Sequence, residues 1–285
     1  MAGRTVWYPG HMAKGKRALE ELASKLDVLL EVRDARAPRL TASPQAQELR
    51  RRRPVWVILA KRDLAEEEVT ASWLRWLERD GGRAWAMDLR KGRLDHLRRA
   101  LREMAPGHRE ARVAVVGVPN VGKSLLLNQL LGGGHRAPVG GIPGITKGVS
   151  WYRVEGDLLV VDSPGILDPK AEAGLQRALA WLGSSKGEVI GGAESLAVDL
   201  LRYLRDHALW SVVDRTWGVR PSESDNPDDP DDPDDLDLLG RRLGCLLRGN
   251  RVDRELAGRR LLDAFSQGKV GPLSLERPGE GGDGA

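Results

Sequence analysis

RVAVVGVPNVGKSLLLNQLL, residues 112 to 131, decides the fold of this chain. A short apolar run leads into a turn with the spacing G-x-x-x-x-G-K-S, and a leucine-rich run follows it. A strand, a glycine-bearing turn and a helix form the context that a phosphate-binding loop requires. Gly117 and Gly122 let the backbone curl so that its N–H groups and the positive end of the helix face a phosphate. The sequence therefore predicts an α/β fold of the P-loop NTPase type.

The side chains of this loop and of the next motifs indicate phosphate and metal ligands. Lys123 supplies a point charge to the β- and γ-phosphates, and the Ser124 hydroxyl can ligate Mg²⁺. Downstream, DLLVVDSPGI is a strand that ends in Asp162-x-x-Gly165. We expect Asp162 to hold the metal through water and the Gly165 amide to sense the γ-phosphate. Thr146, in the intervening GGIPGITKG, is the expected second hydroxyl ligand for Mg²⁺.

Strand-like and helix-like stretches alternate over about the first 165 residues. This pattern predicts a mostly parallel sheet with helices on both faces, which makes three layers. EEEVTASWLRWLERD and GRLDHLRRALREM place apolar residues at helical spacing, so we interpret Trp73 and Trp76 as packing residues. The expected strands are residues 28–33, 55–60, 83–87, 112–116, 149–154 and 158–161.

Strand signals stop at about residue 176, and residues 193–209, 237–250 and 253–268 have the pattern of amphipathic helices. We therefore expect a first domain that begins with a basic arm and a second, all-α domain. An Asp-Pro tract interrupts the second domain and cannot bury apolar surface, so we expect a disordered acidic loop there. The expected boundaries are 1–175 for the first domain, 176–277 for the helical domain, 222–237 for the acidic loop and 278–285 for a disordered tail.

Charge and composition point to the class of partner. The net charge of +4 becomes +13 when the nine acidic residues of the Asp-Pro tract are set aside. Such a surplus, rich in arginine, suggests a polyanionic partner, with nucleic acid the leading candidate, although general solubility would give a similar surplus. Cys245 is the single cysteine, and no apolar run approaches the roughly 20 residues of a membrane span. We expect a cytoplasmic protein in which Cys245 packs in a core.

VWVILAKRDL, residues 55 to 64, supplies a candidate base reader ahead of the phosphate loop. The Asp63 carboxylate can accept both the ring N–H and the exocyclic amino N–H of guanine, a pair that adenine does not offer. Lys61 can lay its aliphatic stem along the base. Taken alone, Lys-Arg-Asp is better explained by an exposed charged turn, but the phosphate loop elsewhere in the chain favours the base-reading role.

These motifs, in this order, resemble the circularly permuted GTPases of the ribosome biogenesis GTPase A family. The resemblance covers nearly the whole chain, and its most specific part is the base reader preceding the phosphate loop. A compact sheet tolerates opening at a different loop, so permutation preserves the site. The motifs are WYPGHMAKGKR (7–17), DARAP (34–38), AKRDL (60–64), GVPNVGKS (117–124), PGITKG (143–148), DSPGI (162–166) and RGNRVDRELAGRRLLDAFSQGKVG (248–271).

The resemblance implies a circularly permuted GTPase domain followed by a small all-α domain. It implies GTP hydrolysis with Mg²⁺, binding of GTP and GDP, and, for the helical domain, contact with rRNA during assembly of the large (50S) ribosomal subunit; we expect a monomer. By position only, a base-contacting loop corresponds to Ala86, Met87 and Asp88. DARAP, with Asp34, Arg36 and Pro38, is interpreted as a structural turn. The phosphate-loop contacts implied are Pro119, Asn120, Val121, Gly122, Lys123, Ser124 and Leu125.

The chain departs from the family at Ala60, where the family has an asparagine that braces the base pocket and the phosphate loop. Losing a buried polar bracket costs about 1 to 3 kcal/mol, so guanine affinity is expected to fall while discrimination through Asp63 survives. The residue after Asp-x-x-Gly is Ile166, which cannot orient a water molecule as a glutamine does. We therefore expect slow intrinsic GTP hydrolysis. The alternative hypothesis is a nucleotide-gated RNA-binding module with negligible GTPase activity. A P-loop kinase is a weaker third reading.

Two residues offer replacements for the missing glutamine. His11 is implicated by the resemblance as catalytic and could position water when a partner orders the amino-terminal arm. It is equally explained as a surface histidine of an RNA-contacting basic arm. Asn120 matches the asparagine with which related GTPases bind K⁺, a cation that can take the place of an arginine finger. It is also explained as an ordinary turn residue.

Overall fold

The computed structural model describes residues 20–91, 94–132, 151–154, 158–162, 172–185, 191–222 and 233–279. These residues form two compact units. One, which we call the sheet unit, contains residues 20–162 and the carboxyl-terminal residues 274–279; the other, the helical unit, contains residues 172–273. No helix among the described residues combines the length and apolar character needed to cross a membrane.

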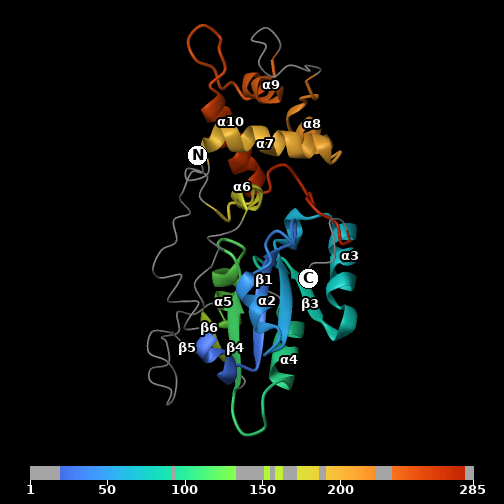
Figure 1. Ribbon diagram of the computed structural model, residues 1–285, viewed down its shortest axis with the longest axis vertical. Coiled ribbons are helices and arrows are strands. Elements are labelled where there is room, and N and C mark those ends of the chain that lie inside the picture. The colour runs from blue at the N-terminus through green and yellow to red at the C-terminus, as the bar shows by residue number, and fades with distance from the viewer. Residues whose placement is uncertain are drawn as a thin grey trace. The chain divides into compact units, whose positions relative to one another are not determined.

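The sheet unit contains a six-stranded sheet in the order β3-β2-β1-β4-β6-β5 (Figure 1). Five strands run parallel and only the edge strand β5 is antiparallel, pairing with β6. Every side chain of the central strand β1 is buried, as expected for a strand covered on both faces. The strands are β1 (Val28–Asp34), β2 (Val55–Ala60), β3 (Arg83–Met87), β4 (Ala111–Val116), β5 (Trp151–Val154) and β6 (Leu158–Asp162).

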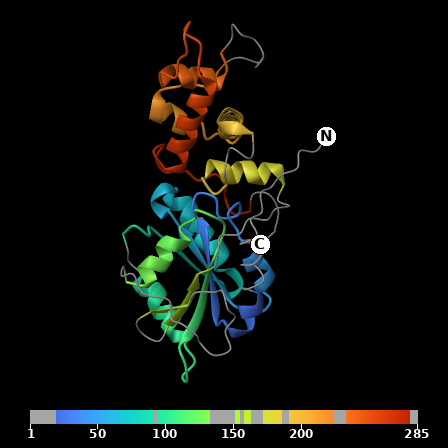
Figure 2. The ribbon, with the colours of Figure 1, turned by 90° about the vertical axis from the view of Figure 1, so that its left-hand side faces the viewer.

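Helices cover both faces of this sheet (Figure 2), which confirms the predicted three-layer fold. On one face, the buried side chains of Leu29, Val57 and Ala114 pack against α2, α3 and the short helix η1. α4 and α5 lie on the opposite face (Figure 2). The helices and 3-10 turns of this unit are η1 (Ala23–Lys25), α2 (Pro44–Leu49), η2 (Arg62–Leu64), α3 (Glu67–Leu77), η3 (Arg79–Gly81), α4 (Asp95–Glu103) and α5 (Lys123–Leu130).

The helical unit is built around α7 and α10, which pack closely against each other and against α6 and α9. Its core includes leucines from these helices together with Phe265, and Cys245 is fully buried as a free thiol. Asp234 and Asp253 cap the first turns of α9 and α10 by accepting backbone N–H groups. The helices are α6 (Ala173–Trp181), α7 (Gly192–Asp206), α8 (Ser211–Trp217), α9 (Asp235–Arg242) and α10 (Arg254–Ser266).

The structure differs from the expected boundaries where local contacts override composition. α6 crosses the expected domain boundary at residue 175 and packs on α7, so it belongs to the helical unit. Residues 274–277 belong to the sheet unit because they form hydrogen bonds with it. The acidic tract does not end in a loop: residues 235–237 form the first turn of α9, where carboxylates favour a helix amino terminus. Residues 223–232 lie outside the described residues.

The helix expected over residues 237–250 is also shorter than its pattern suggests. α9 ends at Arg242, and Gly244 then adopts a left-handed conformation with φ of 67°. The chain continues into a small hairpin closed by a bridge between Leu246 and Val252. Leu246 and Leu247, whose spacing suggested a buried helix face, are therefore exposed.

The close contact of α7 with α10 yields a test of packing in the helical unit. An added Cβ at Gly258 would lie 2.5 Å from the Ala193 carbonyl oxygen, which is backbone and cannot rotate away. For Gly258→Ala, the gain in helix propensity is about 1 kcal/mol, whereas overpacking costs about 1 to 3 kcal/mol. We expect urea denaturation to show a net loss of up to about 2 kcal/mol in the free energy of unfolding.

Gly174→Ala is the matched control, because among the described residues no atom outside the adjoining backbone of α6 lies within 4 Å of the added Cβ. Its free energy of unfolding should stay unchanged or rise by up to about 1 kcal/mol. Equal responses of the two variants would contradict the assigned contact between α7 and α10.

Candidate nucleotide-binding site

The five parallel strands end along the same edge of the sheet. In open parallel sheets, ligands bind beyond the carboxyl ends of the strands, at the point where the strand order reverses. Here that point lies between β1 and β4, because β1 pairs with β2 on one side and with β4 on the other. Across the edge, the strands end at Met87, Ala60, Asp34, Val116 and Asp162.

The phosphate loop follows β4 and has the backbone geometry that an anion requires. An added Cβ at Gly117 would lie 2.5 Å from the carbonyl oxygen of Val32 in β1, so only glycine permits this close approach. α5 begins directly after Gly122, whose φ is 117° and which, as the N-cap residue, has no side chain to cap the first N–H groups. These N–H groups, with the helix dipole, can therefore receive a phosphate. Lys123 is buried, and its Nζ donates to the Val118 carbonyl oxygen at 2.7 Å, which holds the ammonium at the loop.

The predicted base reader follows β2 in a tight turn. Lys61 adopts a left-handed conformation with φ of 58°, and η2 begins at the next residue. This turn leaves the Asp63 side chain exposed, as a carboxylate that contacts a ligand must be. The Lys61 ammonium lies 2.9 Å from Oδ2 of Asp34 at the end of the neighbouring strand.

The two motifs meet at Ala60 and Gly122. An added Cβ at Gly122 would lie 3.4 Å from the Ala60 Cβ and 3.3 Å from Cδ1 of Leu89, which is ordinary to tight van der Waals contact. Ala60 is 1% exposed, so its methyl group packs where the resemblance led us to expect a polar bracket. A second link exists, because Nε2 of Gln129 in α5 donates to the Leu89 carbonyl oxygen at 3.2 Å. The loop after β3 is thus tied to the phosphate-loop helix by packing and by this hydrogen bond.

The DARAP turn contributes more than the structural turn that we expected from the sequence. Asp34 is completely buried, and Arg36 donates to its two carboxylate oxygens at 3.0 and 2.8 Å. Burial by itself would raise the pKa of Asp34, but the hydrogen bond and charge of Arg36 and the charge of Lys61 outweigh burial and lower that pKa. Asp34 therefore stays ionised and fixes the position of the Lys61 ammonium. Three charged residues, Glu31, Arg33 and Asp34, lie in this fully buried strand, so the sequence signalled that buried charges need partners without showing which residues supply them.

The remaining predicted residues of the phosphate loop and of the loop after β3 differ in their exposure and contacts. The Val121 side chain is fully buried, so only its backbone can face a ligand, whereas Asn120, Ser124 and Leu125 are exposed and Pro119 is half-buried. Met87 ends β3 and is half-buried. The Asp88 carboxylate accepts the backbone N–H of Arg90 at 3.0 Å and forms an ion pair with Lys91, so it already has partners in its own loop.

The donor set suits Mg²⁺, which usually takes one or two carboxylates together with hydroxyls, waters and substrate phosphates. Ser124 is the second residue of α5 and has an exposed side chain, and Asp162 ends β6 beside Val115 of β4. Within the described part of the chain, no group of three or more His, Cys, Asp or Glu side chains could hold a metal ion without such help. The predicted residues His11, Thr146, Gly165 and Ile166, and the Asp162 side chain, lie outside the described residues.

Comparison with known proteins identifies the family. The profile described as 50S ribosome-binding GTPase matches residues 112–209. Ribosome biogenesis GTPase A of Bacillus cereus is 31% identical to this chain over 97% of its length and 95% of the relative. The protein of the same name from Thermotoga maritima is 33% identical over 95% and 94%.

Solved structures give the same result for the fold. GDP-bound YlqF from T. maritima superposes with a TM-score of 0.65 at 29% identity, covering 91% of this chain and 98% of that one. The GNP-bound form gives 0.64 at 28% identity, covering 93% and 99%. These likenesses confirm the predicted circularly permuted GTPase fold. The chain therefore belongs to the ribosome biogenesis GTPase A family of GTP-hydrolysing enzymes.

Proposed function

We propose that this chain binds GTP and Mg²⁺ at the carboxyl edge of its sheet and hydrolyses the GTP during assembly of the large (50S) ribosomal subunit, where it binds rRNA. The proximity of Ala60 to Gly122 carries the proposal, because the segment that contains the proposed base reader then lies beside the phosphate loop although their order in the chain is reversed. The names of the relatives support the ribosomal role.

Each end of the nucleotide has its own set of residues in this proposal. Asp63 accepts the two guanine N–H groups, Lys61 lies along the base, and Met87 and Asp88 border it. The α5 amino terminus, residues 119–125, holds the phosphates, with Lys123 as the point charge. Ser124, Thr146 and, through water, Asp162 would hold Mg²⁺, which would supply positive charge against the charge that develops on the γ-phosphate.

Hydrolysis needs groups that the base reader and phosphate loop do not supply. Ile166 cannot orient water, so we assign that role to His11 when the ribosomal particle orders the amino-terminal arm. Asn120 is proposed to bind K⁺, which stabilises transition-state charge. The Gly165 amide senses the γ-phosphate. When hydrolysis removes this phosphate, the segment around Gly165 rearranges, and the change is transmitted to the helical unit that follows in the chain.

Base recognition through Asp63 is tested by Asp63→Asn. The amide loses one acceptor oxygen, so the Kd for GDP should rise by about 10 to 100-fold while the Kd for ADP stays constant. Xanthine offers a carbonyl where guanine has an amino group, so the Kd for xanthosine diphosphate should fall. Titration with fluorescent nucleotides measures all three. Glu67→Gln, in an exposed ion pair with Arg62, is the control and should leave all three unchanged; unaltered GDP binding in Asp63→Asn would contradict the assignment.

Ribosomal stimulation is tested by multiple-turnover phosphate release with and without 50S particles. We expect slow release alone, a rise of about tenfold or more with particles, and a lower rate when Na⁺ replaces K⁺. His11→Ala should lose the stimulated rate and keep GDP affinity. Absence of a rise with 50S particles would contradict the proposed role in subunit assembly.

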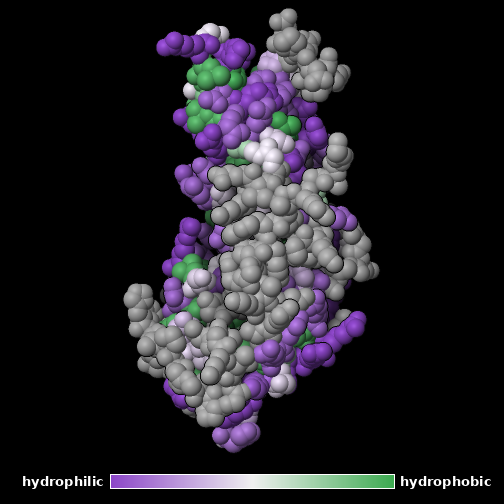
Figure 3. Space-filling view, turned by 60° about the vertical axis from the view of Figure 1, so that its left-hand side comes forward, coloured by the Kyte–Doolittle hydropathy of each residue, from purple (hydrophilic) through white to green (hydrophobic). Residues whose placement is uncertain are grey.

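The helical unit presents a basic surface that suits rRNA. Arg241, Arg248 and Arg251 are exposed, and their guanidinium groups have no ion-pair or hydrogen-bond partner among the described residues. They stand on α9 and on the hairpin after it, whose exposed leucines lie between them. The described surface of this unit is mostly hydrophilic with small hydrophobic patches (Figure 3). Guanidinium groups of this kind pair with phosphates and stack on unpaired bases.

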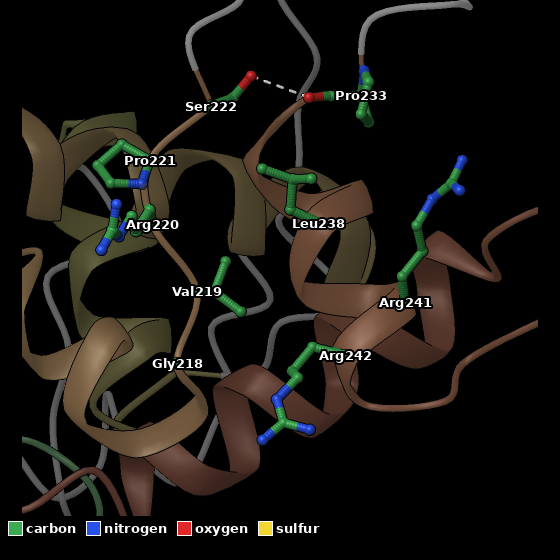
Figure 4. Close-up of a pocket in the computed structure, with 9 residues that line it drawn as sticks. All are labelled: Gly218, Val219, Arg220, Pro221, Ser222, Pro233, Leu238, Arg241 and Arg242. Carbon is green, nitrogen blue, oxygen red and sulfur yellow. Dashed lines mark hydrogen bonds between the residues drawn. The ribbon is translucent and has the colours of Figure 1, made fainter.

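A groove of about 770 Å³ adjoins this surface. Three arginines, Arg220, Arg241 and Arg242, stand around it with their guanidinium groups directed apart (Figure 4). Arg242 is held in place, since its Nε donates to the Trp217 carbonyl oxygen at 2.6 Å. Spread guanidinium groups along a groove match the spaced charges of a phosphate backbone.

The rRNA contact is tested by Arg241→Gln/Arg248→Gln/Arg251→Gln. Each lost phosphate contact should reduce the slope of log K against log salt by about 0.7 to 0.9, or about 2 to 3 for the triple variant. The control Arg51→Gln/Arg52→Gln/Arg79→Gln removes the same charge from exposed positions of the sheet unit and should change this slope by less than 1. Filter binding to 23S rRNA fragments measures both, and equal losses would show that total charge, rather than this surface, governs binding.

A further inference from the structure

Residues 274–277, which we call the carboxyl-terminal strap, pack against the turn that follows β1. Ser274 and Leu275 are only 5% and 3% exposed. The Leu275 backbone N–H donates to the Arg36 carbonyl oxygen at 2.8 Å. The Glu276 carboxylate accepts the backbone N–H groups of Arg39 and Leu40, the latter at 3.1 Å. The strap therefore fixes the DARAP turn and the residues after it.

The strap also holds the segment that follows the base reader. Oγ of Ser274 accepts the backbone N–H of Glu66 at 3.2 Å, at the start of α3. The Trp73 indole is fully buried, and its Nε1 donates to the Glu276 carbonyl oxygen at 3.1 Å. Two elements that are separate in the sequence, the turn after β1 and the start of α3, are thus joined through one short stretch of chain.

The base reader lies between these two points of attachment. On one side, the Leu275 backbone N–H donates to the Arg36 carbonyl oxygen, and the Arg36 guanidinium donates to the Asp34 carboxylate. The same carboxylate pairs with the Lys61 ammonium. From the other side, Ser274 holds the residue at which the turn containing Asp63 passes into α3. Movement of the strap would release Lys61 and Asp63 together.

We propose that the carboxyl-terminal strap is a positioning segment of the guanine pocket, which controls nucleotide affinity through the Asp34–Lys61 ion pair and through Glu66. The inference rests on the proposed base-reading role of Lys61 and Asp63. Residue 273 is the last of the helical unit, so the strap connects that unit covalently to the base end of the pocket. Whatever displaces the end of the helical unit would therefore change how tightly the base is held.

The strap variant Ser274→Ala/Glu276→Ala removes the side-chain acceptors for Glu66, Arg39 and Leu40. Stopped-flow displacement of fluorescent GDP should show dissociation about tenfold faster than in the unaltered chain. The Kd for ADP divided by the Kd for GDP should fall by a similar factor, because only the contacts with the guanine base are weakened. Asp27→Asn is the matched control: Asp27 precedes β1, at the opposite end from Asp34, and pairs with Arg109 at 2.7 Å. It should lower the Tm and leave GDP dissociation unchanged.

A double-mutant cycle separates positioning from a purely structural role. Asp34→Asn should speed GDP dissociation in the unaltered chain but add nothing in a Lys61→Met background, while lowering the Tm in both. If the strap variant lowered the Tm but left the rate of GDP dissociation unchanged, the inference would be overturned while the proposed function would stand. Additive effects of Asp34→Asn and Lys61→Met on that rate would have the same meaning. Failure of the unaltered chain to prefer GDP over ADP would overturn the proposed function and the inference with it.

Discussion

A carboxylate without access to solvent, that of Asp34, stands at the end of the central strand, and the surrounding residues are arranged to neutralise it. A buried charge that loses its partner costs several kcal/mol, so the turn after β1 must return Arg36 to it. The chain after β2 must also supply a cation, which Lys61 does from a left-handed backbone conformation. The interaction that the fold needs for stability is thus the one that sets the position of Lys61, the proposed base-reading lysine.

The covalent order of the elements gives the helical unit two connections to the proposed nucleotide pocket. It follows β6, whose last residue is the proposed metal ligand Asp162, and it ends where the chain returns to the turn after β1. One connection therefore starts at the phosphate and metal end of the pocket and the other finishes at the base end. In an unpermuted GTPase domain these two ends are joined within the domain itself. Permutation places a second domain between them.

The strands were predicted to within one or two residues because apolar runs buried on both faces are distinct in sequence. The phosphate loop was equally clear, since its spacing stands between a strand and a helix. The ion pair of Asp34 with Lys61 could not be predicted, because it joins two strand ends whose adjacency depends on strand order. Ser274 to Arg277 show no periodicity, so their place on the sheet unit was missed. Asp235 to Asp237 were assigned to a loop because composition does not register a helix cap.

The predicted length of one helix in the helical unit was wrong for a related reason. The pattern over residues 237–250 continues past Arg242, but the backbone turns at Gly244, and a hairpin replaces the last turns of the expected helix. Periodicity describes which face a helix would bury without stating where the helix ends. The same hairpin carries two of the arginines that we assign to rRNA.

The strap has a thermodynamic effect on the unit that precedes it. Because residues 274–277 are bound to the sheet, the chain between β6 and the strap forms a closed loop of about 100 residues even when its helices melt. Closing a loop of that size removes about 4 to 5 kcal/mol of conformational freedom from the melted form by the chain-entropy estimate. The helices of the second unit therefore gain stability from a segment that they do not contain, and they would lose this contribution if the strap detached.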